Sequence, residues 1–172
     1  DLNVLPENGS SIGLKAAALA AQRGLPLAPE SVEGIAGNFQ EIKEPWSRDV
    51  RENFISLIGS GESIFKVIES IDQKNLISKW IPEWEHVRFL PQRNVLHRHT
   101  VDRHMLETVV EATKLIRTVR RPDLLLVAAL FHDIGKGYPD KDHSNYGAAL
   151  IRGIANRSEE HTSELQSLRH LV

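Results

Sequence analysis

The sequence predicts an all-α protein, and three of its features support that fold class. Apolar residues recur every three or four positions in many segments, a spacing that places them on one face of a helix. No segment shows the alternation of apolar and polar residues that is typical of a half-buried strand. Glycine and proline separate the periodic segments at short intervals, as they do between helices joined by short loops.

Short helices are expected throughout residues 1–85. Ser10 or Ser11 can cap the first of them, which an alanine-rich run favours and which should end near Gly24. Further helices are expected at Pro29 to about Ile42, Ser47 to about Ile58, Ser63 to Ile71 and Asn75 to Trp80.

Three longer helices are expected in the second half, after a connection without clear periodicity. They should span about 100–118, 124–134 and 144–154. Residues 124–131 are apolar on every side, which predicts a helix buried all round, and Gly135 should cap its C-terminal end. The turn before this helix is short, so it should pack antiparallel to the helix that precedes it.

Length, charge and cysteine content narrow the class of protein. The 172 residues suit one domain of ordinary size, or one and a half. The formal net charge of −2 predicts neither nucleic acid nor an anionic membrane as a partner. The absence of cysteine excludes disulfides and thiolate metal sites. Because no apolar run reaches the roughly 18 residues of a membrane span and no signal peptide is visible, a cytoplasmic location is expected.

The histidines indicate a metal site. Five of the eight lie between His97 and His143. His132 and Asp133 follow the apolar helix directly, and His104 lies in the first half of the preceding helix, so antiparallel packing can bring these three side chains together. Imidazole and carboxylate ligands suit a divalent ion, Mn or Mg above all, with Fe, Co or Zn as further candidates. The alternative is that the His-Asp pair only hydrogen-bonds to itself or to a helix end.

Two further side chains have a predicted chemical role. A metal held by two imidazoles and a carboxylate keeps open positions where water can be activated to attack a phosphate ester. Lys136 is placed to neutralise a phosphate oxygen. His143 can hold a second ion or protonate a leaving group.

Other candidates near these residues are expected to play lesser parts. Asp102 cannot share the helix face of His104, so it should support a ligand or cap the helix. Surface or packing roles are expected for His86 and His97, whereas His99 can line the mouth of the site.

Three stretches resemble the HD phosphohydrolase superfamily. They are Thr-Val-Asp-Arg-His at Thr100–His104, His-Asp-Ile-Gly-Lys-Gly at His132–Gly137, and Asp-His-Ser at Asp142–Ser144 with the Gly-Ala pair that follows at 147–148. Within the superfamily, residues 3–154 resemble the central part of the bacterial PII uridylyltransferase/uridylyl-removing enzymes. The stretch Arg93–Asp102 is similar to the actinobacterial version of that family.

The resemblance implies a function. It implies metal-dependent hydrolysis that removes a nucleotidyl group, UMP or AMP, from a tyrosine of the PII nitrogen-signalling protein, within a bifunctional enzyme that responds to glutamine. It also implies His104, His132 and Asp133 as metal ligands, with His143 as a further metal-site position. Two alternatives stay open: an HD-type hydrolase of a free nucleotide, and an inactive helical docking or regulatory module.

The resemblance also predicts how the chain is divided. Residues 1–85 should link to a nucleotidyltransferase domain outside this chain, and residues 86–156 should form the N-terminal part of an HD domain. Residues 157–172 are expected to be a non-native tail, because residues 158–167 match a translated reading frame of a common sequencing adapter. HD sites usually draw another Asp from later helices, so this chain is expected to hold a partial site, to bind metal weakly and to hydrolyse little.

Overall fold

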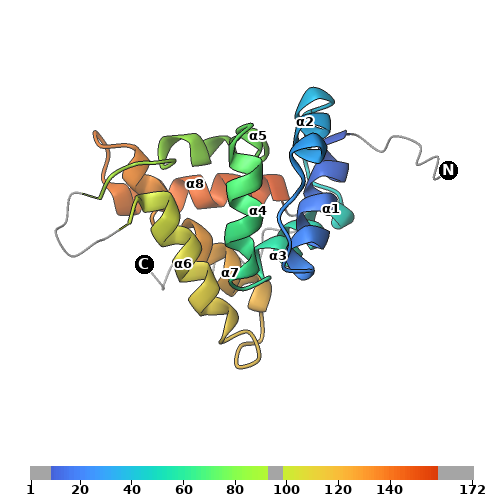
Figure 1. Cartoon of the computed structure of the whole chain (residues 1–172). Coiled ribbons are helices and arrows are strands. Elements are labelled where there is room, and N and C mark those ends of the chain that lie inside the picture. Colours follow the sequence, from blue (N-terminus) through green and yellow to red (C-terminus); the bar gives the residue numbers. More distant parts are fainter. Residues whose placement is uncertain (1–8, 93–98, 159–172) are drawn as a thin grey trace.

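A computed structural model describes residues 9–92 and 99–158, and this part of the chain is all-α, without a strand (Figure 1). The predicted fold class is therefore confirmed. The α-helices are α1 (Gly9–Gln22), α2 (Pro29–Gly37), α3 (Arg48–Ile58), α4 (Ser63–Asp72), α5 (Leu76–Trp80), α6 (Val101–Thr113), α7 (Pro122–Phe131) and α8 (His143–Ser158). Two short 3-10 helices are η1 (Pro82–His86), after α5, and η2 (Ile134–Gly137), between α7 and α8. None of the helices in the described ranges is both long and apolar enough to cross a membrane.

Several helix ends follow the residues that mark them in the sequence. The hydroxyl oxygen of Ser47 accepts the backbone N–H of Val50 at 3.4 Å and so caps the start of α3. Gly24 follows α1 with a φ of +68°, the left-handed conformation that commonly terminates helices.

Two helices are shorter than predicted. α2 ends at Gly37, where the side-chain amide of Asn38 donates to the carbonyl oxygen of Gly34 at 2.9 Å and satisfies an end of the helix. α6 ends at Thr113, whose hydroxyl donates to the carbonyl oxygen of Val110 at 2.6 Å. In each case a local side-chain bond to a backbone carbonyl accompanies the end of the helix, before its apolar periodicity runs out.

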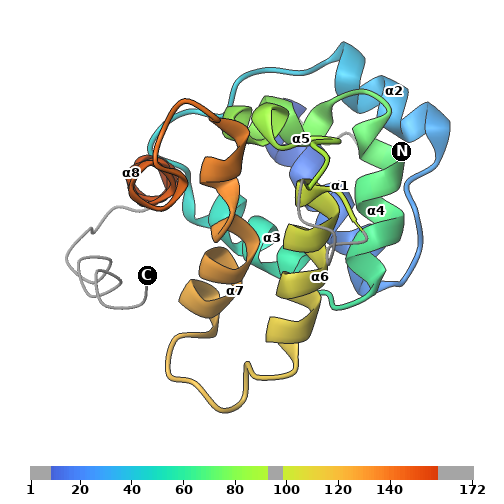
Figure 2. The same ribbon diagram turned by 90° about the vertical axis from the view of Figure 1, so that its left-hand side faces the viewer.

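α6 and α7 form the antiparallel pair that the short turn predicted. The two helices lie side by side in both views, joined by a loop at one end of the molecule (Figures 1 and 2). α8 runs across this pair, is seen end-on in Figure 2, and packs against η2. α1 packs against α3 and α4 on the other side of the molecule.

One hydrophobic core joins the two halves of the chain. Its buried members come from both sides of residue 85 and include Leu14, Ile58, Trp84, Met105 and Phe131. The rings of Phe54 in α3 and Phe131 in α7 stack with centroids 6.4 Å apart. The boundary expected at residue 85 stays a prediction about domain organisation, but it does not coincide with a gap in the core.

α7 is less buried than its sequence predicts. Only Leu126, Leu130 and Phe131 are buried, whereas the other apolar residues of the helix are half-buried. In the described part of the chain, α6, α3 and α8 contact this helix and leave part of its surface accessible. The expectation of a helix buried all round is therefore wrong.

The prediction that Gly135 caps α7 is wrong. α7 ends at Phe131, and Gly135 lies buried within η2. A Cβ atom at Gly135 would overlap the carbonyl oxygen of His143 and lie 2.9 Å from the backbone nitrogen of Gly147. Glycine is needed here because η2 and the first turn of α8 approach backbone to backbone.

Candidate metal centre

Three predicted ligands converge between α6 and α7. Nε2 of His104 lies 3.2 Å from Nε2 of His132 and 3.6 Å from Oδ2 of Asp133. The same oxygen of Asp133 lies 3.3 Å from Nε2 of His132. Among the described residues, these three side chains form a group that could hold a metal ion, because their ligand atoms all lie within 4.8 Å of one another.

The antiparallel helix pair places these groups. His104 lies in the first turn of α6 between the buried residues Val101 and Met105, and its side chain is partly exposed, at 29%. His132 and Asp133 follow the last residue of α7, and that end of α7 returns to the start of α6. The site therefore forms where the apolar packing of the two helices ends.

The imidazole of His132 is oriented by the helix that precedes it. Its Nδ1 lies 2.9 Å from the carbonyl oxygen of Ala129, which can only accept a hydrogen bond, so Nδ1 carries a proton in this contact. When the ring is neutral, its lone pair is then on Nε2, which faces His104 and Asp133. When the ring is protonated, the same Nε2 carries a proton and donates to Asp133 instead. A backbone carbonyl that fixes a histidine tautomer in this way is a common support for metal ligands.

Asp133 carries a negative charge at neutral pH. Burial alone would raise the pKa of its carboxyl group, but hydrogen bonds from His132 and Lys136 outweigh burial and hold that pKa well below its usual range. The hydrogen bond to Asp133 in turn raises the pKa of His132, against the opposite effect of burial. The ionised carboxylate of Asp133 therefore makes the site attractive to a cation.

Lys136 already contacts this carboxylate. Its ammonium lies 2.7 Å from Oδ2 of Asp133 and 3.4 Å from the side-chain oxygen of Gln92. The predicted position of Lys136 beside the ligands therefore agrees with the geometry. Its role toward a phosphate stays a prediction.

His143 is the predicted site residue that lies apart from the three ligands. It is the first residue of α8, its side chain is exposed, and it is not a member of the three-residue group. Its backbone lies against η2, through the close approach at Gly135. Its predicted part in metal binding or proton transfer stays a prediction.

The neighbouring candidates have other partners. Oδ2 of Asp102 accepts the backbone N–H of Phe89 at 2.9 Å, and its predicted part in supporting a ligand or capping the helix stays a prediction. Nε2 of His99 lies 3.4 Å from a carboxylate oxygen of Glu107. The ring of His86 packs on that of Tyr138 with centroids 4.4 Å apart. His97 lies outside the described residues.

Gln92 contacts Lys136 at the edge of the site, and nothing in the sequence indicated this contact. It belongs to the connection before α6, and neither a periodic pattern nor a motif includes it. A polar residue in such a connection shows its role only when the tertiary structure places it.

The donor set fits one divalent ion. On a first-row ion with bonds of about 2.1 Å, neighbouring ligand atoms lie about 3.0 to 3.4 Å apart. The three spacings of 3.2, 3.3 and 3.6 Å are close to that range. Two imidazoles and a carboxylate also match the ligand types that Mn, Fe, Co and Zn accept.

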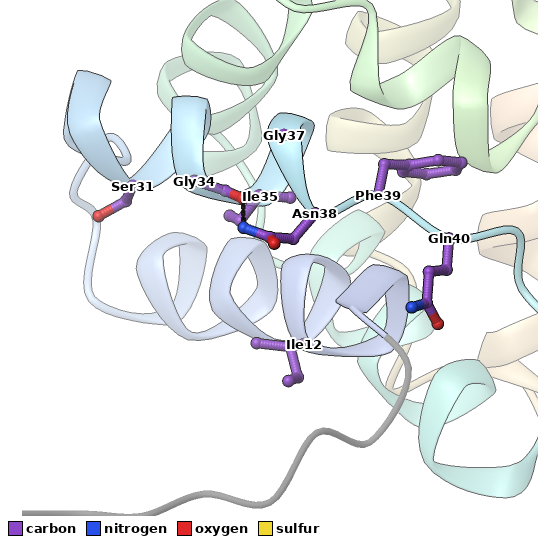
Figure 3. Close-up of a pocket in the computed structure, with 8 residues that line it drawn as sticks. All are labelled: Ile12, Ser31, Gly34, Ile35, Gly37, Asn38, Phe39 and Gln40. Atoms are coloured by element: carbon purple, nitrogen blue, oxygen red, sulfur yellow. Dashed lines mark hydrogen bonds between the residues drawn. The ribbon is translucent and has the colours of Figure 1, made fainter.

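A surface hollow lies elsewhere, on α1, α2 and the segment after α2 (Figure 3). Its lining residues are Ile12, Ser31, Gly34, Ile35, Gly37, Asn38, Phe39 and Gln40. None of these side chains is ionisable, so the hollow offers no acid, base or metal ligand of its own.

Comparison with known proteins identifies the region that holds the site. Residues 101–172 match the HD domain family. The chain is 46% identical to the bifunctional uridylyltransferase/uridylyl-removing enzyme of Streptomyces coelicolor over 152 residues. This matched segment covers 88% of the chain and 18% of that protein. The enzyme of the same name from Mycobacterium tuberculosis is 36% identical over 97% of this chain and 20% of its own length. That of Corynebacterium glutamicum is 33% identical over the whole chain and 26% of its own length.

The chain therefore spans about a fifth of the length of the first two relatives. No solved structure matches it.

Proposed function

We propose that this chain belongs to the hydrolytic part of a bifunctional uridylyltransferase/uridylyl-removing enzyme. It carries an HD domain and is homologous to the actinobacterial enzymes of that name. The reaction is metal-dependent hydrolysis of the phosphodiester that joins a uridylyl or adenylyl group to a tyrosine of a PII signalling protein. The observation that carries this proposal is the convergence of His104, His132 and Asp133 at the junction of α6 and α7.

The three converging side chains would hold a divalent cation. When bound, that cation would polarise a phosphoryl oxygen and acidify a water molecule. Ala129 keeps Nε2 of His132 available for it, and Asp133 is ionised at neutral pH. This division of roles agrees with the ligand set that the sequence predicted.

Two further residues would act on the substrate. The ammonium of Lys136 is close enough to Asp133 to meet a phosphate oxygen at the same place, where negative charge increases during hydrolysis. In the reaction the oxygen of water forms a bond to phosphorus and the bond from phosphorus to the tyrosine oxygen breaks. His143, exposed at the start of α8, would donate the proton that this tyrosine oxygen takes up.

The proposal includes the setting of the reaction. PII is the protein substrate, glutamine is an effector of the longer enzyme, and the cytoplasm is the compartment. The division into residues 1–85 as a linking segment and 86–156 as the first part of the HD domain belongs to the same proposal.

Calorimetric titration of Mn²⁺ tests the metal site first. The unchanged chain should bind one ion, and the double variant His132→Ala/Asp133→Ala should bind none, because two of the three ligands are gone. His86→Ala is the matched control, since it removes an imidazole that packs on Tyr138 outside the ligand group. Equal binding by the unchanged chain and the double variant would contradict the proposed site.

An assay with nucleotidylated PII tests the substrate. Release of UMP or AMP that depends on Mn²⁺ and disappears in the double variant would support the proposal. Faster hydrolysis of a free nucleotide than of nucleotidylated PII would favour the alternative of a free-nucleotide hydrolase.

A further inference from the structure

Gln92 lies beside the candidate metal centre without belonging to any of its motifs. Its side-chain oxygen is the second acceptor within reach of Lys136, at 3.4 Å, while Oδ2 of Asp133 is the first, at 2.7 Å. Because an ammonium can only donate, the amide must present its oxygen to Lys136. The orientation of the Gln92 amide is therefore fixed by this contact.

The chain around Gln92 is tied to the start of α6. The carboxylate of Asp102 accepts the backbone N–H of Phe89, which has a positive φ of 54°. The backbone N–H of Val101 donates to the carbonyl oxygen of Leu90 at 2.8 Å. These two bonds hold the residues just before Gln92 against the helix that carries His104.

The position of the Gln92 amide is unfavourable for its nitrogen. Its nitrogen is buried and has no hydrogen-bond partner among the described residues. A buried donor left without an acceptor is unfavourable, and such groups in folded proteins often mark functional positions. The contact with Lys136 therefore explains why an amide side chain occupies this position.

The site has a conflict of charges that this amide can resolve. Oδ2 of Asp133 is the oxygen nearest to both imidazoles, and the same oxygen is the one that the ammonium of Lys136 contacts. A divalent cation between the three ligands would compete with the ammonium for this oxygen and would also repel it. Lys136 then needs another acceptor close by if it is to stay in the site.

We propose that Gln92 is a positioning residue that accepts the ammonium of Lys136 when a divalent cation takes Asp133. The amide oxygen is neutral, so it can hold the ammonium without competing for the cation. Lys136 stays next to the ligands, where a phosphate oxygen can meet it. This inference rests on the proposed function, because it needs the three ligands to bind a cation.

A double-mutant cycle on Mn²⁺ affinity tests the inference. Gln92→Leu removes the acceptor and should weaken Mn²⁺ binding by about three- to tenfold, the effect of losing a long hydrogen bond to a charged group. Lys136→Met removes the competing ammonium and should tighten binding. In the Lys136→Met background, Gln92→Leu should then change the affinity by less than about twofold. Gln92→Glu keeps an acceptor for Lys136 and adds a negative charge near the cation, so it should bind Mn²⁺ at least as tightly as the unchanged chain.

Controls separate this inference from the proposed function. Gln73→Leu, the same change at an exposed position after α4, should leave Mn²⁺ affinity unchanged. Equal weakening by Gln92→Leu with and without Lys136 would overturn the inference, since the glutamine would then act on the fold alone. An unchanged affinity in Gln92→Leu would also overturn it, while the proposed metal site would stand. Failure of the unchanged chain to bind Mn²⁺ would refute the proposed site and this inference with it.

Discussion

At the scale of single residues, the candidate site depends on one carboxylate oxygen. Oδ2 of Asp133 lies within 3.6 Å of nitrogen atoms from His104, His132 and Lys136. Two of these are the other predicted metal ligands and the third is the predicted phosphate contact. The side chain of Asp133 is only 13% exposed, so these charges interact in a partly desolvated place where they are stronger than on the surface.

A glycine substitution tests the backbone that supports this carboxylate. Gly135→Ala should lower the free energy of unfolding by about 2–4 kcal/mol, because its Cβ atom would overlap backbone atoms of α8 that cannot move aside cheaply. Gly153→Ala is the matched control. No atom lies within 4 Å of its added Cβ, and in the interior of α8 the change should stabilise by about 0.5–1 kcal/mol. Urea unfolding measures both, and a neutral Gly135→Ala would contradict the close approach.

At the scale of elements, two of the three candidate ligands follow the end of α7, and the start of this helix is stabilised by charge. Asp123 lies in the first turn of the helix, where a carboxylate is favoured by the helix dipole. The hydrogen bond from Arg121, at 2.7 Å, is the main cause that lowers the pKa of Asp123, against the effect of burial. Since both side chains are more than a third exposed, at 41% and 36%, water screens much of this attraction.

The pH dependence of Asp123→Asn tests this stabilisation. A carboxyl group whose pKa is lowered by folding contributes stability above its unfolded pKa of about 3.9, and that contribution is lost as the pH falls through the folded pKa. Asp123→Asn should therefore cost about 0.5–1 kcal/mol at pH 7 and progressively less below about pH 4. Asp140→Asn, on an exposed loop residue, is the control. Thermal unfolding at a series of pH values measures the difference, and a pH-independent cost would contradict the role of the charge.

At the scale of the whole molecule, α8 is tied to distant parts of the chain by its last full turn. The guanidinium of Arg157 donates two hydrogen bonds to the carboxylate of Glu83, at 2.8 and 2.7 Å. The backbone carbonyl of Arg157 accepts the N–H of Trp46 at 2.7 Å. Arg157 is also the first residue of the predicted non-native tail. That prediction still stands, although in this structure the residue contacts η1 and the segment before α3.

Removal of this ion pair tests how strongly the two halves are joined. Arg157→Ala would leave Glu83, whose side chain is only 12% exposed, without its partner, and should cost about 2–3 kcal/mol. Arg152→Ala, an exposed position on the same helix, should change stability by less than about 0.5 kcal/mol. Urea unfolding compares them, and equal effects of the two variants would show that Arg157 adds nothing specific.

The sequence by itself determined the fold class, most of the helices and the three side chains that converge as candidate ligands. Helical spacing and capping residues act locally, and a short connection leaves two helices little choice but to pack antiparallel. The sequence is therefore enough to predict that His104, His132 and Asp133 lie together. The tertiary structure alone decided the half-buried surface of α7, the need for Gly135 and the contact of Gln92 with Lys136. Each of these depends on which segments meet across long separations in the chain, and local periodicity carries no information about such meetings.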